Sequence, residues 1–569
     1  MDTKSSDNAH IEAYSGPPKE KIEHIEVVES GSKMMILTGT EDLSYGKNGI
    51  AGIVSSGYIF GIAFLASMGG FSFGYDQGVI SLILTMEQFH NQFPETAPGH
   101  SNQGFYVGFM TGMLELGAFL GCLVYPYVAD RWSRKWGLSF AVVWFCVGAI
   151  IQTAAQDYGM LVAGRTIGGV GVGTLALGAP LYISEISPPN LRGSLLVLET
   201  FSIVVGAVIA YWLTYGTAEI SSQWAFRLPF LLQMVPALMV GIGIHFFPFS
   251  PRWLCMRARN DEALKSLATL RRLPVEDFRV QTEWKGIVAE IATMNEVAYR
   301  KWGDVTGFKL ELLGWKELFT PRYIRRTAVA AAIPFFQQFS GINAFVYYAP
   351  TLFRALGQDE HSSLVLSGMI NICQLVGACI IITSLDKVGR RKLAICGGIA
   401  MGIPHAILAG LVARFNSSWQ DHPGPAWFGV ALIYFYVLMY SLSYGPLGWS
   451  LIAEVWPNSN RAKGVAMAVS VNWISNTIIG ITVPPMIESI GFGTYIFFAC
   501  FCFLATVFSF FFVPETANLN LEEIDRLFKD NSATDEAELR RDVIIGLAAE
   551  TTAELKTEKP CHQSNFDEN

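Results

Sequence analysis

Three ionisable side chains interrupt apolar stretches of the sequence that are each about 20 residues long. They are Asp76, Glu115 and Arg165, and each stands in a different stretch. A charged group inside a membrane-length apolar segment is costly, so it indicates a function by default. Arg165 is the expected partner of Asp76, and protonation of Asp76 would break that pair and give a switch. A static ion pair is the alternative, and a coupling role for Glu115 stays open.

A second group of polar residues consists of amides within another apolar stretch, at Gln337, Gln338 and Asn343. Neutral donor–acceptor groups of this kind suit a ligand rich in hydroxyls, and buried amides must face protein or a cavity, not lipid. Gln337 and Asn343 would lie about 240° apart on an ideal helix. They can line one cavity only if the helix breaks between them, which Ser340 and Gly341 permit. The alternative is hydrogen bonding between helices.

The elements that carry these residues are predicted to be membrane-spanning helices. Of the 569 residues, 51% are hydrophobic and only 15% are charged, and the mean hydropathy is +0.35. This composition excludes disordered and ordinary soluble classes. The net charge of −8 gives no reason to expect nucleic-acid binding. We expect twelve spans, at 57–81, 104–127, 136–153, 159–181, 194–216, 227–249, 327–351, 363–385, 393–413, 427–449, 464–487 and 493–513.

The loops predict the orientation of these spans. Lys and Arg gather in the loops that follow the even-numbered spans, whereas the segment 88–103 has none. The basic loops are therefore expected in the cytosol, together with both termini. The sequon at Asn416 falls in an outer loop close to the membrane, and its glycosylation stays open.

An internal repeat divides the chain into two halves. Asp130-Arg-Trp-Ser-Arg-Lys135 echoes Asp386-Lys-Val-Gly-Arg-Arg391, and Glu185…Arg192 echoes Glu454…Arg461. We predict an all-α membrane protein of two six-helix halves in the same topology, the architecture of the major facilitator fold, with a cytoplasmic helical linker. The expected divisions are a disordered cytoplasmic tail (1–56), the first half (57–250), the linker helices (251–326), the second half (327–513) and a solvated cytoplasmic tail (514–569).

Several motifs in this frame resemble those of the sugar porters of the major facilitator superfamily, and the sequence is most similar to fungal monosaccharide transporters. The matching motifs are Gly164-Arg165-Thr-Ile-Gly168-Gly169-Val-Gly171-Val-Gly173, Pro180-Leu-Tyr182-Ile-Ser-Glu185-Ile-Ser-Pro188, Gln337-Gln338-Phe-Ser-Gly341-Ile-Asn343, Gly445-Pro446-Leu-Gly-Trp449, Glu454…Arg461 and Pro514-Glu515-Thr516.

The resemblance implies a sugar site. Its expected residues are Gln337, Gln338, Asn343, Gln374, Trp449, Asn472 and Thr200. Trp449 matches the aromatic residue that flanks the sugar, and Gln374 is preferred over Asn371. Thr200 stands where the family usually has a sugar-binding Gln, which leaves the substrate open. Its neighbour Glu199 is either a substitute contact or a helix-end charge.

The resemblance also implies gates. Glu–Arg networks at the cytoplasmic ends of the helices would lock the two halves together when the cytoplasmic gate is shut, and the alternative is a topology signal alone. The expected members are Arg131, Arg134, Glu185, Arg192, Arg390, Glu454 and Arg461. Tyr347 and Tyr348 are expected at the outer gate. Ser133 replaces a glycine of the first loop motif.

These features predict a plasma-membrane monosaccharide transporter that works by alternating access. The resemblance implies sugar:proton symport through Asp76 and Arg165, because proton-coupled sugar porters carry an acid at the position of Asp76. A passive facilitator and a non-transporting sugar sensor are the alternatives. No nucleophile–base constellation indicates an enzyme, and the nine cysteines lack metal-ligand spacing, so no cofactor or metal is expected. The expected partners are a small sugar, a proton and the lipid bilayer, and the protein is expected to be monomeric.

Overall fold

The computed structural model describes residues 45, 57–382, 388–416, 418–517, 519 and 521–557. The expected N-terminal tail therefore lies outside the described residues, except for Tyr45. Within the described ranges the chain is helical and contains no strand.

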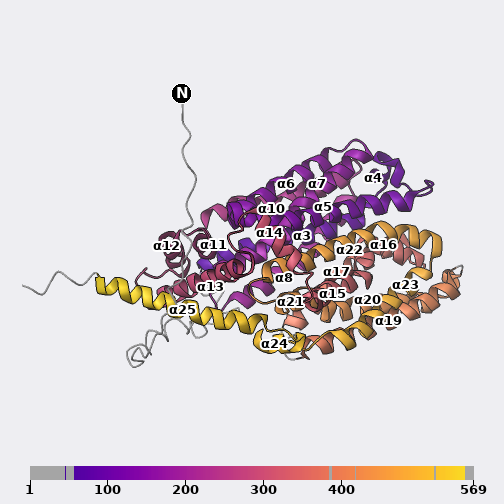
Figure 1. Ribbon diagram of the computed structural model, residues 1–569. Coiled ribbons are helices and arrows are strands. Elements are labelled where there is room, and N and C mark those ends of the chain that lie inside the picture. The colour runs from indigo at the N-terminus through magenta and orange to yellow at the C-terminus, as the bar shows by residue number, and fades with distance from the viewer. Residues whose placement is uncertain are drawn as a thin grey trace, which may run out of the picture.

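The first half of the chain forms six long helices (Figure 1). The last of them is divided in two at Gln233. The short α4 (Glu87–Gln92) follows the first helix. The helices of this half are α3 (Gly57–Ile83), α5 (Gln103–Trp132), α6 (Arg134–Ala154), α7 (Tyr158–Ile186), α8 (Arg192–Ala218), and α9 (Trp224–Leu232) with α10 (Met234–Gly243).

The second half repeats this pattern with two divided helices. They are α15 (Ile324–Phe339) with α16 (Ile342–Ala355), α17 (Glu360–Ile382), α19 (Arg390–Phe415), α20 (Pro423–Leu442) with α21 (Tyr444–Glu454), α22 (Arg461–Ile490) and α23 (Gly493–Phe512).

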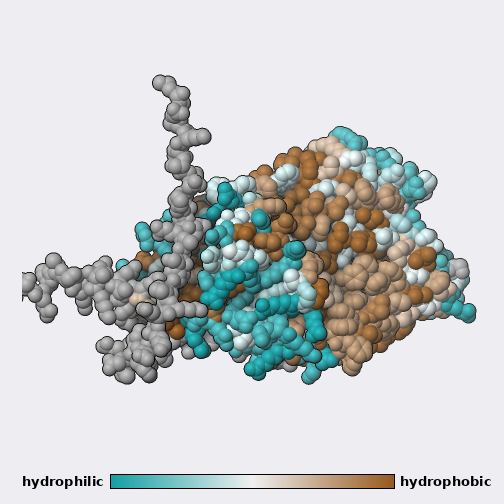
Figure 2. Space-filling model, in the orientation of Figure 1, coloured by the Kyte–Doolittle hydropathy of each residue, from teal (hydrophilic) through white to brown (hydrophobic). Residues whose placement is uncertain are grey.

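The helices have the length and surface of membrane spans. Eleven of those described are long and apolar enough to cross a bilayer. The helix α3 is not among the eleven, but it has 27 residues, about 40 Å at 1.5 Å per residue, and packs along α8 and α7. Hydrophobic surface covers the flank of the bundle, and hydrophilic surface lies at its two ends (Figure 2). The predicted all-α fold with two six-helix halves is confirmed.

Four helices connect the halves at one end of the bundle, which we call the linker side (Figure 1). They are α11 (Pro251–Met256), α12 (Asn260–Arg271), α13 (Phe278–Trp302) and α14 (Phe308–Glu317). Arg271 of α12 donates to the carbonyls of Ile186 and Ser187 at 2.8 and 3.0 Å, and it forms a 2.6 Å ion pair with Glu283. These bonds fasten the linker to the end of α7, where the last carbonyls of a helix need partners.

The chain after the second half returns to the same side. It forms α24 (Leu521–Phe528) and α25 (Ser532–Thr557), and α25 packs against α13 of the linker. The buried Arg326 at the start of α15 pairs with Asp525 at 2.5 Å and with Asp530 at 2.7 Å. This part of the tail is therefore docked on the bundle, whereas the sequence suggests a solvated segment.

The two halves touch on the side away from the linker. There α5 lies against α22 along a stripe of small residues, and a Cβ added at Gly108 would be 2.5 Å from the carbonyl oxygen of Ile481. Tyr211 of α8 donates to the carbonyl of Leu364 of α17 at 2.6 Å. Small residues allow such close helix contacts. We conclude that the structure is closed between the halves on the side away from the linker.

Candidate functional site

The first feature of the site is a break in the helix that carries the predicted amides. Helix α15 ends at Phe339 and α16 begins at Ile342, and Gly341 between them has a φ of +96°. The Ser340 carbonyl accepts a hydrogen bond from the Tyr436 hydroxyl at 2.9 Å and lies 3.0 Å from Nε2 of the buried His405. Glycine suits this left-handed conformation. The predicted helix break is confirmed, and side chains of α19 and α20 hold it.

The break brings the predicted amides together. Asn343 Nδ2 donates to Gln338 Oε1 at 2.6 Å, and Gln338 Nε2 donates to Asn472 Oδ1 at 3.1 Å. Asn472 Nδ2 in turn donates to Gln337 Oε1 at 2.7 Å. Gln337 Nε2 lies 3.1 Å from the carbonyl of Tyr444. We call these four side chains the amide cluster.

Sequence reasoning missed one amide of the site, Asn476. Its Oδ1 accepts from Asn343 Nδ2 at 2.7 Å, and its Nδ2 donates to the Tyr347 hydroxyl at 3.1 Å. Tyr347 then donates to Glu115 Oε1 at 2.5 Å. Asn476 lies four residues after Asn472 on α22, so both share one helix face, and that spacing is the signal that could have revealed it.

The remaining predicted sugar contacts, Trp449, Gln374 and Thr200, make no hydrogen bond to the amide cluster within the described residues. Gly448 packs so closely against the Gln337 amide that a side chain would not fit there, and Trp449 is the next residue in the chain. Gln374 on α17 and Thr200 on α8 are half-buried, and these two helices pack together across the halves. Gln374 makes no side-chain hydrogen bond within the described chain. The alternative Asn371 is buried, and its Oδ1 has no hydrogen-bond partner there.

The predicted pair of Asp76 and Arg165 is present inside the first half. Arg165 Nη1 lies 3.7 Å from Asp76 Oδ1, and the two side chains are 1% and 3% exposed. Neither of these two atoms has a hydrogen-bond partner among the described residues. Arg165 is fixed instead by its Nε, which donates to the Met110 carbonyl at 3.1 Å. The two charges attract each other through a buried gap and not through a hydrogen bond.

The predicted gate residues form two ion-pair clusters on the linker side. In the first half Arg134 binds Glu185 at 2.9 Å and Asp130 at 2.6 Å. In the second half Arg390 binds Glu454 at 2.8 Å, and Thr516 donates to the same carboxylate at 2.6 Å.

These two ion pairs each connect helices within one half of the molecule. Glu185 lies near the end of α7 beside the tight turn between α5 and α6, and Glu454 ends α21 beside the start of α19. Each pair therefore connects helices of one half. The expected role of Glu–Arg networks, to lock the halves together when the cytoplasmic gate is shut, stays a prediction, because this conformation places each pair within one half.

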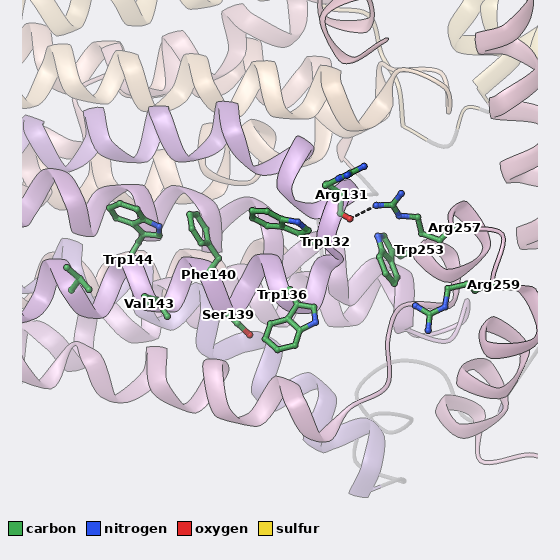
Figure 3. A pocket seen from close by; sticks show the side chains of 11 residues that line it. Arg131, Trp132, Trp136, Ser139, Phe140, Val143, Trp144, Trp253, Arg257 and Arg259 are labelled. Atoms are coloured by element: carbon green, nitrogen blue, oxygen red, sulfur yellow. Dashed lines mark hydrogen bonds between the residues drawn. The ribbon is translucent and has the colours of Figure 1, made fainter. Parts of the chain in front are cut away.

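The other predicted gate residues lie apart from these pairs. Arg461 Nη2 is 3.5 Å from the Trp456 carbonyl. The side chain of Arg192 lies outside the described residues. Arg131 is exposed and lines a groove on the outer surface of the first half, where its carbonyl accepts a hydrogen bond from Arg257 (Figure 3).

That groove has a volume of about 1010 Å³ and is separate from the amide cluster. Trp132, Trp136 and Trp144 of α5 and α6 line it, with arginines at its linker end (Figure 3). Trp132 is 58% exposed and Trp136 is 54% exposed. Exposed tryptophans beside arginines are typical of a membrane–water interface, so the groove belongs to the lipid-facing surface.

Two six-helix halves around a central polar cluster define a transporter of the major facilitator superfamily. The family model described as "Sugar (and other) transporter" matches residues 62–528, so the chain belongs to that family of sugar transporters. Its relatives are transporters and not enzymes.

Individual proteins show the same similarity. A high-affinity glucose transporter of Kluyveromyces lactis is 31% identical over 493 residues, which cover 83% of this chain and 85% of that protein. A probable quinate permease of Aspergillus niger is 31% identical over 515 residues, covering 85% and 93% of the two chains. The structure of the proton:xylose symporter XylE, bound to 6-bromo-6-deoxy-D-glucose, is similar with a TM-score of 0.67 and 28% identity. That match covers 83% of this chain and 99% of the symporter, and XylE of Escherichia coli in a partially occluded inward-open conformation matches with a TM-score of 0.66.

Proposed function

We propose that this protein is a proton-coupled monosaccharide symporter of the plasma membrane, with both termini in the cytosol. The observation that carries the proposal is the buried pair of Asp76 and Arg165. A carboxylate held only 3.7 Å from an arginine, without a hydrogen bond, can gain a proton more readily than one in a bidentate pair. Its protonation would cancel the attraction between α3 and α7, and that change can be linked to the movement of the halves.

The amide cluster is the proposed sugar site. Gln337, Gln338, Asn343 and Asn472 present neutral donors and acceptors, and together they can exchange their mutual hydrogen bonds for bonds to sugar hydroxyls. Trp449 follows Gly448, which packs against Gln337, and we assign it the aromatic face of the site. The names of the relatives support a small polyhydroxylated substrate, because they include a glucose transporter, a probable quinate permease and a symporter bound to a glucose derivative.

The contacts that join the halves indicate which state of the alternating-access cycle this structure represents. In this orientation the side away from the linker is the outer side, and it is closed by α5 against α22 and by α16 against α3. The ion pairs of the linker side stay within each half. This arrangement corresponds to a state whose sugar site faces the cytosol. In the opposite state the outer contacts would separate, and the linker ends of the halves would meet.

Uptake by the purified protein in proteoliposomes tests the proposal. We expect radiolabelled D-glucose or another monosaccharide to accumulate when the medium is more acidic than the vesicle interior, and to equilibrate without a gradient. A panel of unlabelled competitors would identify the preferred sugar. Uptake that ignores the gradient would make the protein a facilitator, and sugar binding without any uptake would make it a sensor.

A further inference from the structure

We propose that Glu115 is a positioning residue that couples proton binding to sugar affinity through Tyr347. This inference rests on the proposed function and deepens it, because it adds a second carboxylate and a route to the sugar site. The structure assigns the route by an unbroken series of hydrogen bonds from Glu115 to the amide cluster.

All the hydrogen bonds of this series are donated in the direction of the Glu115 carboxylate. Asn343 donates to Asn476, Asn476 donates to Tyr347, and Tyr347 donates to Glu115. Asn476 and Tyr347 are thus each both acceptor and donor, and the carboxylate of Glu115 is the final acceptor. A hydrogen bond to an ionised carboxylate is about twice as strong as a neutral one, and linked hydrogen bonds polarise one another.

The same series connects the two halves of the protein. Glu115 belongs to α5 of the first half, whereas Tyr347 is on α16 and Asn476 on α22 of the second half. Glu115 is 1% exposed and its Oε2 has no hydrogen-bond partner within the described chain. An ionised Glu115 therefore holds α16, the outer part of the broken helix, against the first half.

The surroundings of Glu115 make its charge sensitive to the proton site. The titratable and charged groups that face it are Tyr347 and Tyr348 of α16, Asp76 of α3 and Arg165 of α7. Arg165 acts on both carboxylates, so a proton on one of them changes how strongly the arginine can stabilise the other.

Protonation of Glu115 has a defined consequence for the sugar. A neutral acid is a weaker acceptor for Tyr347, so Tyr347, Asn476 and Asn343 are held less firmly. The Asn343 amide is then free to bind a sugar hydroxyl. Sugar affinity should rise with protonation, and by linkage sugar binding should favour the proton.

Equilibrium binding of tritiated D-glucose and D-xylose between pH 5.5 and 8.5 tests this inference on the full-length protein. We expect wild-type affinity to weaken by about fivefold as the pH rises. Ionised Glu115 then holds Asn343 in the series, and the sugar loses about one hydrogen bond to that amide. Glu115→Gln should bind with the low-pH affinity of the wild type at every pH. Tyr347→Phe should also lose most of the pH dependence, because the route is cut.

Tyr348→Phe is the matched control, because the Tyr348 hydroxyl donates to the Gly480 carbonyl at 2.8 Å and not to Glu115. It should keep the wild-type pH profile. A pH-dependent wild type with an unchanged profile in Glu115→Gln would overturn this inference and leave the proposed symport intact. A wild type that accumulates sugar with the proton gradient but whose affinity ignores pH would also overturn it. Failure of gradient-driven accumulation would overturn the proposed function itself.

Discussion

Asp76 and Arg165 face each other between α3 and α7 at 3.7 Å, within reach of an ion pair but beyond a hydrogen bond. Arg165 is held in place by the Met110 carbonyl and not by the acid. The position of the arginine therefore does not depend on the charge of Asp76. This arrangement lets the acid change its protonation state while its partner stays fixed.

The amide cluster predicts a loss of sugar affinity in single variants. Gln338→Ala and Asn343→Ala each remove a hydrogen-bonding group worth about 0.5–1.5 kcal/mol, so the apparent KM should rise about 2- to 12-fold. Initial uptake rates over a range of sugar concentrations measure this. Asn102→Ala, which changes an exposed amide before α5, should leave KM unaltered. Wild-type kinetics in both cluster variants would refute the assignment of the sugar site.

The ion pair of Arg390 and Glu454 predicts an effect on turnover. Glu454→Gln weakens the attachment of α19 to α21 without touching the amide cluster, so sugar binding should be preserved while the transport rate falls several-fold. Binding and uptake should be measured on the same preparation. Glu262→Gln is the control, because it breaks an exposed pair with Arg259 and should change neither quantity. Equal losses of binding and transport would argue against a role in the conformational step.

The docked tail predicts a difference between two neighbouring arginines. Arg326→Ala leaves Asp525 and Asp530 buried without their cation, which should cost about 3–5 kcal/mol and release α24. The exposed Lys529 would then be cut faster by trypsin. Arg322→Ala removes an exposed pair with Asp535 and a hydrogen bond to the Ser532 hydroxyl but leaves no buried charge unpaired, so it should hardly change the cleavage rate. Equal cleavage of both variants would mean that the Arg326 pairs do not hold the tail.

Ser133 predicts a stabilising substitution. It has a φ of +111° and a ψ of 160°, a backbone conformation suited to glycine that costs other residues about 1–3 kcal/mol. Ser133→Gly relieves this strain but loses the cap in which the Ser133 hydroxyl accepts from the Trp136 amide, worth a few tenths of a kcal/mol. A net gain of about 1 kcal/mol should appear as a higher midpoint of thermal unfolding in detergent. A lower midpoint would mean that the capping bond outweighs the strain.

Much of this architecture follows from local sequence. Apolar stretches predict the long helices, because a segment in lipid must satisfy the hydrogen bonds of its backbone N–H and C=O groups internally. Gly341 predicts the helix break, because only a residue without a side chain fits easily there. The amides at Gln337, Gln338 and Asn343 then meet as expected.

Other parts of the site depend on distant contacts. Tyr347 and Glu115 are 232 positions apart, so their hydrogen bond follows only from the packing of the two halves. Glu185 and Glu454 each pair with an arginine of their own half, and the expected network that locks the halves in a shut cytoplasmic gate stays a prediction. Which partner a charge selects depends on the conformation of the transporter, and the sequence alone does not encode one conformation.

Proton-driven sugar accumulation by Asp76→Asn tests the central claim most directly. The asparagine resembles the permanently protonated acid and cannot cycle, and it removes the attraction to Arg165. In proteoliposomes with an inward proton gradient, wild-type protein should concentrate the sugar, whereas Asp76→Asn should only equilibrate it and should retain sugar exchange. Accumulation against the sugar gradient by Asp76→Asn would contradict the account.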